Sequence, residues 1–327
     1  MVNWDRIKEY GWELKNKDQA RILSLDGGGI RGIYIAQLLA EIEKDTGKSI
    51  HSFFDLIVGT STGGIIALAL SIGIPAQEIV ELYMDNSKKI FKPLHKLFFK
   101  KIPYASCKYD NSGLQELVKQ KFKEKKLKDA MVMLCITSVE HRNAEPKVYK
   151  TPHNEKIHVD GEKEMWKVAM VTSAAPTYFP ASYEFADACN LDGGLWANNP
   201  VMVGILEALD NKCSLEKIKV LSIGTGENPY NIQNDVAAYG NLLRWKSDFI
   251  NLFMNVQTRA AHNSAKYLIK DNLTRIDFLI QKEYCKIDLD STDKKSLQEL
   301  KRNASYDFQC NYRNGENIFE KFFKVKL

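Results

Sequence analysis

The stretch RILSLDGGGIRG, Arg21–Gly32, joins a short apolar run to four glycines within six residues. The apolar run Ile22–Leu25 predicts a strand, and a helical pattern over 33–44 follows the glycines. A glycine turn between a strand and a helix presents backbone N–H groups to something negative. The negative group can be the pyrophosphate of a nucleotide, or an oxygen that becomes charged only during a reaction.

Short apolar runs and helical patterns alternate along the rest of the chain. We predict strands at residues 21–25, 54–59, 131–138, 147–150, 219–223 and 275–280. We predict helices at residues 33–44, 62–71, 76–88, 113–125, 165–174, 200–209 and 236–268. Such alternation is typical of an α/β protein with a largely parallel sheet covered on both faces. We predict a single domain over residues 1–327, with a helical C-terminal third.

The bulk composition narrows the class of protein. With 44% hydrophobic and 27% charged residues, the chain has an ordinary globular composition. The charged start lacks the apolar core of a signal peptide, and no apolar run is long enough to span a bilayer, so we predict a cytoplasmic location. Six cysteines without a Cys-x-x-Cys pair indicate reduced thiols, and no cluster has metal-ligand spacing. We therefore predict no metal and no cofactor.

Positive charge gathers in one part of the chain. Residues 88–128 hold thirteen lysines and three acidic residues, against a net charge of +5 for the whole chain. Its first part, KKIFKPLHKLFFKK, Lys88–Lys101, interleaves lysines with aromatic and aliphatic residues, which suits an anionic membrane surface. A solvated loop and helix face is the alternative. We find no DNA- or RNA-binding signature. The sequence leaves the oligomeric state open, a homo-oligomer included.

A second strand, turn and helix lies in FFDLIVGTSTGGIIALAL, Phe53–Leu70. Gly-x-Ser-x-Gly between a strand and a helix is the nucleophile elbow, whose tight turn projects the serine Oγ above the sheet edge. Gly59 and Gly63 flank Ser61 because a Cβ at either position would collide across the turn. We predict that Ser61 is a nucleophile. A glycine-serine turn without a catalytic role is the alternative.

An activated serine needs oxyanion donors and a base. The backbone N–H groups of Gly27–Gly29, on the neighbouring turn, can supply the donors. The candidate base is Asp192, in ACNLDGGLWANNP. Gly193 and Gly194 have no side chains that would block the approach of the Asp192 carboxylate. An ordinary Asp-Gly turn is the alternative for this segment.

Two other functions use the same residues. A dinucleotide site on the glycine turn needs an acidic residue at the end of a second strand, but Asp45, 18 residues past Gly27, ends a predicted helix. A Ser61–Asp192–His262 triad has the chain order of α/β-hydrolases. His262, however, lies inside a continuous helical pattern. We therefore favour an enzyme without a catalytic histidine, over both a triad esterase and a non-catalytic nucleotide-binding protein.

The ordered set of motifs resembles the patatin-like phospholipases. The motifs are Asp26-Gly27-Gly28-Gly29-Ile30-Arg31-Gly32, then Gly59-Thr60-Ser61-Thr62-Gly63, then Asp192-Gly193-Gly194. Residues 173–180 and 220–229 also resemble the family, and the match covers about residues 21–227. The resemblance divides the chain into a core over residues 21–227 and a helical extension over residues 228–327.

This resemblance implies a three-layer α/β/α fold and a Ser–Asp dyad. Ser61 would attack an acyl ester of a glycerolipid, and Asp192 would take the serine proton. The Gly27–Gly29 turn would hold the oxyanion, and an acyl-enzyme would form without a metal. We interpret Arg31 as a structural tie for the glycine turn. The substrate would lie in a membrane, which places the enzyme at the inner face of the membrane as a peripheral protein.

The overall layout also resembles phospholipase effectors of bacterial antiphage systems that cyclic nucleotides switch on. In YGNLLRWKSDF, Tyr239–Phe249, Arg244 and Lys246 flank Trp245. An arginine can pair with a phosphate through two hydrogen bonds, and an indole can stack on a base. We therefore predict the effector site there. A plain amphipathic helix with a half-buried tryptophan is the alternative.

Overall fold

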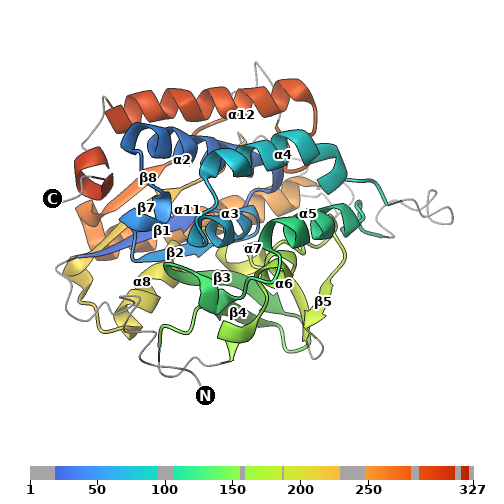
Figure 1. The fold of residues 1–327 in the computed structure, drawn as a ribbon, viewed down its shortest axis with the longest axis horizontal. Helices are drawn as coiled ribbons and strands as arrows, with labels where there is room; N and C mark the ends of the chain where they lie inside the picture. The colour runs from blue at the N-terminus through green and yellow to red at the C-terminus, as the bar shows by residue number, and fades with distance from the viewer. Residues whose placement is uncertain are drawn as a thin grey trace, which may run out of the picture.

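A computed structural model describes residues 19–94, 106–154, 159–185, 188–228, 247–280, 287–313 and 318–323 (Figure 1). The strands are β1 (Ala20–Leu25), β2 (Leu56–Gly59), β3 (Met133–Glu140), β4 (Glu145–Lys150), β5 (Ser182–Phe185), β6 (Ala188–Asp192), β7 (Ile218–Ile223) and β8 (Leu273–Ile276). The α-helices are α2 (Gly32–Thr46), α3 (Thr62–Ser71), α4 (Ala76–Ile90), α5 (Ser112–Phe122), α6 (Met165–Thr172), α7 (Gly194–Ala197), α8 (Val201–Asp210), α11 (Ser247–Ile269) and α12 (Lys294–Asp307). In the described part of the chain, no helix is both long and apolar enough to cross a membrane.

All eight strands form one sheet in the order β5-β6-β3-β2-β1-β7-β8, with β4 paired to β3. The pairs from β3 through β2, β1 and β7 to β8 are parallel, whereas β4, β5 and β6 pair antiparallel. The predicted α/β fold with a largely parallel sheet is confirmed.

The sheet separates two apolar cores because successive side chains along a buried strand point to opposite faces. In β1, Leu23 and Leu25 belong to the larger core, which includes side chains from α2, α3, α4 and α12. Ile22, the residue before Leu23, belongs to the smaller core with side chains from α8 and α11. Figure 1 shows α2, α4 and α12 on one side of the sheet and α8 on the other. The three-layer α/β/α arrangement follows from this alternation.

Four of these elements were not predicted from the sequence: β5, β6, the short helix α7, and α12. β5 and β6 are short strands of mixed polarity, and α12 is rich in lysine. The carboxylate of Asp293 caps α12 by accepting the N–H of Ser296 at 2.9 Å. The predicted helix over residues 236–268 corresponds to α11 from Ser247 onward, and its first part lies outside the described residues.

Strand β3 sets the spacing between the two motifs that carry the predicted dyad. β4 pairs along Cys135–Glu140 on one edge of β3, so β2 and β6 must share the opposite edge. On that edge Gly59 of β2 lies opposite Ile136, and Asp192 of β6 lies opposite Ser138. Two residues along a strand span about 7 Å. The β3 backbone thus brings together residues that are far apart in the sequence.

Candidate active site

Ser61 sits in a strained turn between β2 and α3. Its backbone has φ 54° and ψ −123°, a conformation that non-glycine residues rarely adopt. A Cβ on Gly59 would collide with the carbonyl of Gly63, and one on Gly63 would collide with the carbonyl of Leu25. The two glycines therefore allow the close approach that holds Ser61 in this conformation.

Threonine side chains beneath the turn fix the Ser61 backbone. The N–H of Ser61 donates to Thr172 Oγ1 at 2.9 Å, and this hydroxyl donates to the carbonyl of Thr137 at 2.6 Å. Thr60 Oγ1 lies 2.7 Å from Thr137 Oγ1. The Ser61 N–H is thus bound to Thr172 and is not free to donate to an oxyanion. The turn is tied to β3 and α6 through buried hydroxyls.

Asp192 faces Ser61 from the end of β6. Asp192 is 5% exposed, and its carboxylate accepts the N–H of Gly194 at 2.7 Å. Burial raises the pKa of Asp192 to about 6, although the Ser61 hydroxyl and the Gly194 N–H both act to lower it. The adjacent Gly193 packs so closely on Thr137 that a Cβ there would collide with it.

The three glycines of the turn after β1 differ in what their N–H groups can do. Gly27 donates its N–H to the carbonyl of Asn198 at 2.9 Å, so this amide is occupied. Gly28 and Gly29 line the cavity beside Ser61, and their N–H groups have no acceptor among the described residues. Gly27, predicted as one of three oxyanion donors, is therefore not free to act as one, because its N–H is bound to Asn198 directly after α7. Gly28 and Gly29 remain the candidates.

A further donor lies at the start of α3. Thr62 is the first residue of this helix, so its N–H has no partner within the helix. Its side chain shares a 2.6 Å hydrogen bond with the Tyr83 hydroxyl, and both residues line the cavity. Thr62 is therefore a candidate donor that was not predicted from the sequence, although the position after the nucleophile commonly supplies an oxyanion N–H.

Asp26, the first residue of the glycine motif, is held by a residue that the sequence did not single out. Arg275 of β8 donates to both carboxylate oxygens of Asp26, at 2.9 and 2.6 Å, and also to Ser222 and Asp277. Thr225 Oγ1 donates to the carbonyl of Gly27 at 2.9 Å. The glycine turn therefore depends on β7 and β8 as well as on its own motif.

The remaining motif residues support the packing around the turn. Gly32 faces Thr62 so closely that a Cβ would collide with it. Arg31 is 7% exposed, and its backbone N–H donates to the carbonyl of Gly28 at 3.1 Å. Its Nε has no partner among the described residues, and burial lowers the pKa of the guanidinium. The Arg31 N–H bond closes the turn at Gly28 but does not involve the side chain, so the role that we predicted for Arg31 as a structural tie stays a prediction.

A cavity of about 430 Å³ opens onto Ser61 and Asp192. Apart from a few polar groups at the reacting end, its walls are apolar and aromatic. The wall residues come from α3, α4, α5, the segment 173–179 and α11: Ile65, Tyr83, Ile90, Phe91, Leu114, Tyr178, Phe179, Ile250, Phe253 and Met254. Such a cavity fits a long hydrocarbon chain better than a nucleotide.

His262 does not join Ser61 and Asp192. It lies in α11, does not line the cavity, and its Nδ1 is buried without a partner among the described residues. Burial lowers its pKa, and the nearby charges of Arg275 and Lys266 act in the same direction. The geometry therefore does not assemble the alternative triad.

Two further predictions fall partly or wholly outside the described residues. The effector residues Arg244, Trp245 and Lys246 lie outside them. Of the basic segment Lys88–Lys101, the structure describes only the part up to Leu94, in which α4 ends at Ile90.

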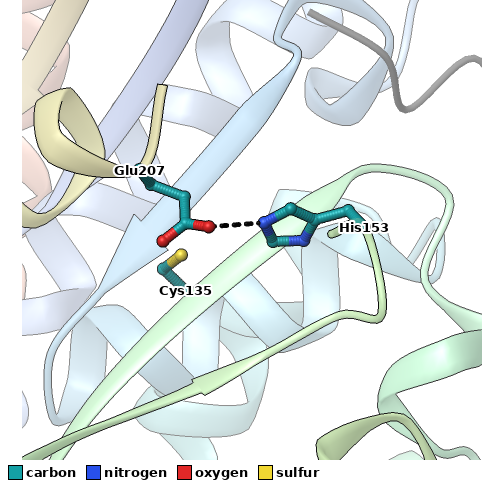
Figure 2. Close-up of side chains that lie close together, drawn as sticks. All are labelled: Cys135, His153 and Glu207. Atoms are coloured by element: carbon teal, nitrogen blue, oxygen red, sulfur yellow. Dashed lines mark hydrogen bonds and ion pairs between the residues drawn. The ribbon is translucent and has the colours of Figure 1, made fainter. Parts of the chain in front are cut away.

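A buried cluster of three residues on the other side of the sheet has the composition of a metal site (Figure 2). The possible ligand atoms of Cys135, His153 and Glu207 lie within 4.8 Å of one another. Two of the three already have partners in the protein: His153 bonds Thr151 at 2.6 Å and Glu207 at 2.9 Å, and Lys150 pairs with Glu207. Burial raises the pKa of the Cys135 thiol. We interpret the cluster as a polar tie between β3 and α8, because a cation there would face the Lys150 charge.

Comparisons with known proteins agree with the motifs. Residues 23–205 match the family model described as patatin-like phospholipase. Three bacterial proteins named "cGAMP-activated phospholipase" are similar: one from Pseudomonas aeruginosa is 30% identical (78% of this chain, 77% of that protein), and one from Escherichia coli is 32% identical (87% of each). The third, from Vibrio cholerae, is 35% identical over 66% of this chain and 67% of that protein. This chain therefore belongs to the patatin-like phospholipase family.

Proposed function

We propose that this phospholipase cleaves glycerolipid acyl esters with a Ser61–Asp192 dyad. The observation that carries the proposal is that Ser61, in its strained turn, and the buried Asp192 meet at the wall of one apolar cavity. Asp192 takes the proton as Ser61 Oγ attacks the ester carbonyl, and then passes it to the leaving alcohol. In the second half, Asp192 takes a proton from water as the water oxygen attacks the acyl-enzyme. Asp192 then returns this proton to Ser61 Oγ as the bond to the serine breaks and the fatty acid leaves.

An aspartate is a weak base at its ordinary pKa of about 3.9. Burial of Asp192 raises the pKa to about 6, which brings the carboxylate closer to the basicity that the reaction needs. Direct contact with Ser61 also shortens the path of the proton. The N–H groups of Gly28, Gly29 and Thr62 are the proposed donors to the oxyanion, each of them worth about 3 kcal/mol of barrier in comparable sites.

The apolar cavity is the proposed binding site for the acyl chain that is cleaved. We place the enzyme on the cytoplasmic face of the membrane as a peripheral protein, with the lysines of the segment Lys88–Lys101 as its contact with anionic headgroups.

We further propose activation by a cyclic nucleotide. The support is the name of three similar proteins and the sequence around Arg244, Trp245 and Lys246. The test measures phospholipid hydrolysis with and without a panel of cyclic di- and trinucleotides. Full activity without any of them, unchanged on their addition, would exclude this control.

The test of the hydrolase proposal is a profile of the lipids released from phospholipid vesicles, with Ser61→Ala as the comparison. We expect free fatty acid and lysophospholipid from the wild type and neither above background from Ser61→Ala. A fluorophosphonate should label the wild type at Ser61. Hydrolysis that survives in Ser61→Ala would reject Ser61 as the nucleophile.

His262→Ala is expected to retain most of the hydrolytic activity, because His262 touches neither Ser61 nor Asp192. We expect kcat/KM for a soluble acyl ester to stay within about threefold of the wild type, less than the loss of about 10² or more for a missing general base. A loss of three or more orders of magnitude in kcat/KM would instead favour the Ser61–Asp192–His262 triad.

A further inference from the structure

Asn198 holds Gly27 with both its main chain and its side chain. Its carbonyl accepts the Gly27 N–H at 2.9 Å. Its Oδ1 lies 2.5 Å from the point where a Cβ of Gly27 would sit, and this point is 3.3 Å from Ser61 Cβ. Asn198 is 7% exposed and lines the cavity. Gly27 must be glycine because the Asn198 amide occupies the space of a side chain.

Helix α11 in turn holds Asn198. Gln257 Oε1 accepts the Asn198 N–H at 2.5 Å, and Asn198 Nδ2 donates to Thr258 Oγ1 at 3.1 Å. These contacts leave Asn198 Oδ1 facing Gly27 without a hydrogen-bond partner among the described residues. Consecutive contacts therefore run from α11 through Asn198 to Gly27.

The two ends of α11 are anchored differently. Near its C-terminal end, Ala265 and Ile269 are buried in the smaller core. Near its N-terminal end, Ile250 and Met254 line the cavity, and Phe253 lines it while remaining 51% exposed. This half of the helix thus forms part of the cavity wall.

We infer that Asn198 is a positioning residue through which α11 sets the conformation of the Gly27–Gly29 turn. Oxyanion donors act only when they lie about 3 Å from the developing charge, so a small shift of Gly27 changes what Gly28 and Gly29 stabilise. A movement of the first half of α11 reshapes the cavity and the oxyanion donors together. This inference rests on the proposed function, since it takes the turn to be the oxyanion site.

The test compares two ketones that carry the same alkyl chain. A trifluoromethyl ketone adds to Ser61: a C–O bond forms, the serine proton moves to Asp192, and the former carbonyl oxygen becomes an anion at the turn. The methyl ketone stays unreacted and reports binding in the cavity alone. The ratio of the two inhibition constants therefore measures oxyanion stabilisation, and a change in cavity binding alone would not alter it.

The main variant is Gln257→Leu with Thr258→Val, which removes both contacts from α11 and leaves Asn198 in place. We expect kcat/KM and the affinity for the trifluoromethyl ketone to fall by the same factor, about 10 or more. One oxyanion donor contributes a factor of about 10²–10³ to kcat, and a misplaced donor loses part of this factor. The methyl ketone constant should stay within about threefold. Val256→Ala, an exposed position on the same helix, is the matched control and should change neither.

An unchanged ratio of the two constants in the double variant, or an equal change in Val256→Ala, would overturn the inference. If both ketones lose affinity because the double variant packs poorly, the single variant Thr258→Val replaces it. The ratio of its two inhibition constants then tests the inference. Failure of the proposed function gives a different result: the wild type then forms no fluorophosphonate adduct on Ser61. An adduct on Ser61 with an unchanged ratio leaves the dyad in place and rejects the role of Asn198.

Discussion

Asp192→Asn is expected to lower kcat/KM for a soluble acyl ester by about 10³ or more, because a positioned general base contributes about 10²–10⁴ and Asp192 serves in both halves of the proposed reaction. The amide has the shape of the carboxylate, and its oxygen can still accept the Gly194 N–H. The free energy of unfolding should therefore hold or rise, since a buried charge has been removed.

The pH dependence follows from the raised pKa of Asp192. The carboxylate must be ionised to accept the Ser61 proton, so kcat/KM should rise with pH through about 6 and level off above it. An unburied aspartate would give a rise near pH 4 instead. Asp210→Asn, at an exposed position, should leave both the rate and the profile unchanged. Retained activity in Asp192→Asn, or a rise near pH 4, would reject Asp192 as the base.

Arg275→Met is expected to lower the free energy of unfolding by about 3–5 kcal/mol, because it breaks a buried ion pair and leaves one charge without its partner. The Asp26 side chain is 3% exposed, and Arg275 contacts both of its oxygens. Because Asp26 directly precedes Gly27, kcat/KM should fall by about tenfold or more as well. Urea unfolding and ester hydrolysis measure the two effects.

The control for Arg275 is an exposed ion pair of the same chemistry. Arg302→Met breaks a pair with Glu299 in which the arginine is 69% exposed, and its cost should stay below about 1 kcal/mol. Adding Asp26→Asn to Arg275→Met should restore part of the lost stability, because the uncompensated charge is gone. If the effects of the two substitutions on the free energy of unfolding are additive, the contact between Asp26 and Arg275 does not stabilise the fold.

The fold could be predicted where apolar runs and helical periods are long. Helix α3 matches its predicted range of residues 62–71, and β1, β2, β3, β4 and β7 lie within about two residues of theirs. β5 and β6 were missed because their inward-facing positions are few and interrupted by polar residues. Yet β6 delivers Asp192, whose place was found through its Asp-Gly-Gly motif rather than through secondary structure.

The site could be predicted only where a local motif marks it. Ser61, Asp192 and the glycine turn carry such motifs, and the structure brings them together. Arg275, Gln257 and Thr258 carry none, since an arginine before an apolar residue or a Gln-Thr pair in a helix is common. Their roles depend on pairings across 249 and about 60 residues, which only the folded chain shows.

The placement of Arg275 and Leu289 bears on how the enzyme is made in the cell. A chain is synthesised and begins to fold from its N-terminus, so Ser61 and Asp192 leave the ribosome long before β8 does. Until then Asp26 lacks Arg275, and the N–H of Ile30 lacks the carbonyl of Leu289, its acceptor at 2.9 Å. On the proposed mechanism, a half-made chain therefore carries the nucleophile and the base without a finished oxyanion turn. On the same mechanism, we expect lipid cleavage to begin only after β8 and Leu289 have left the ribosome.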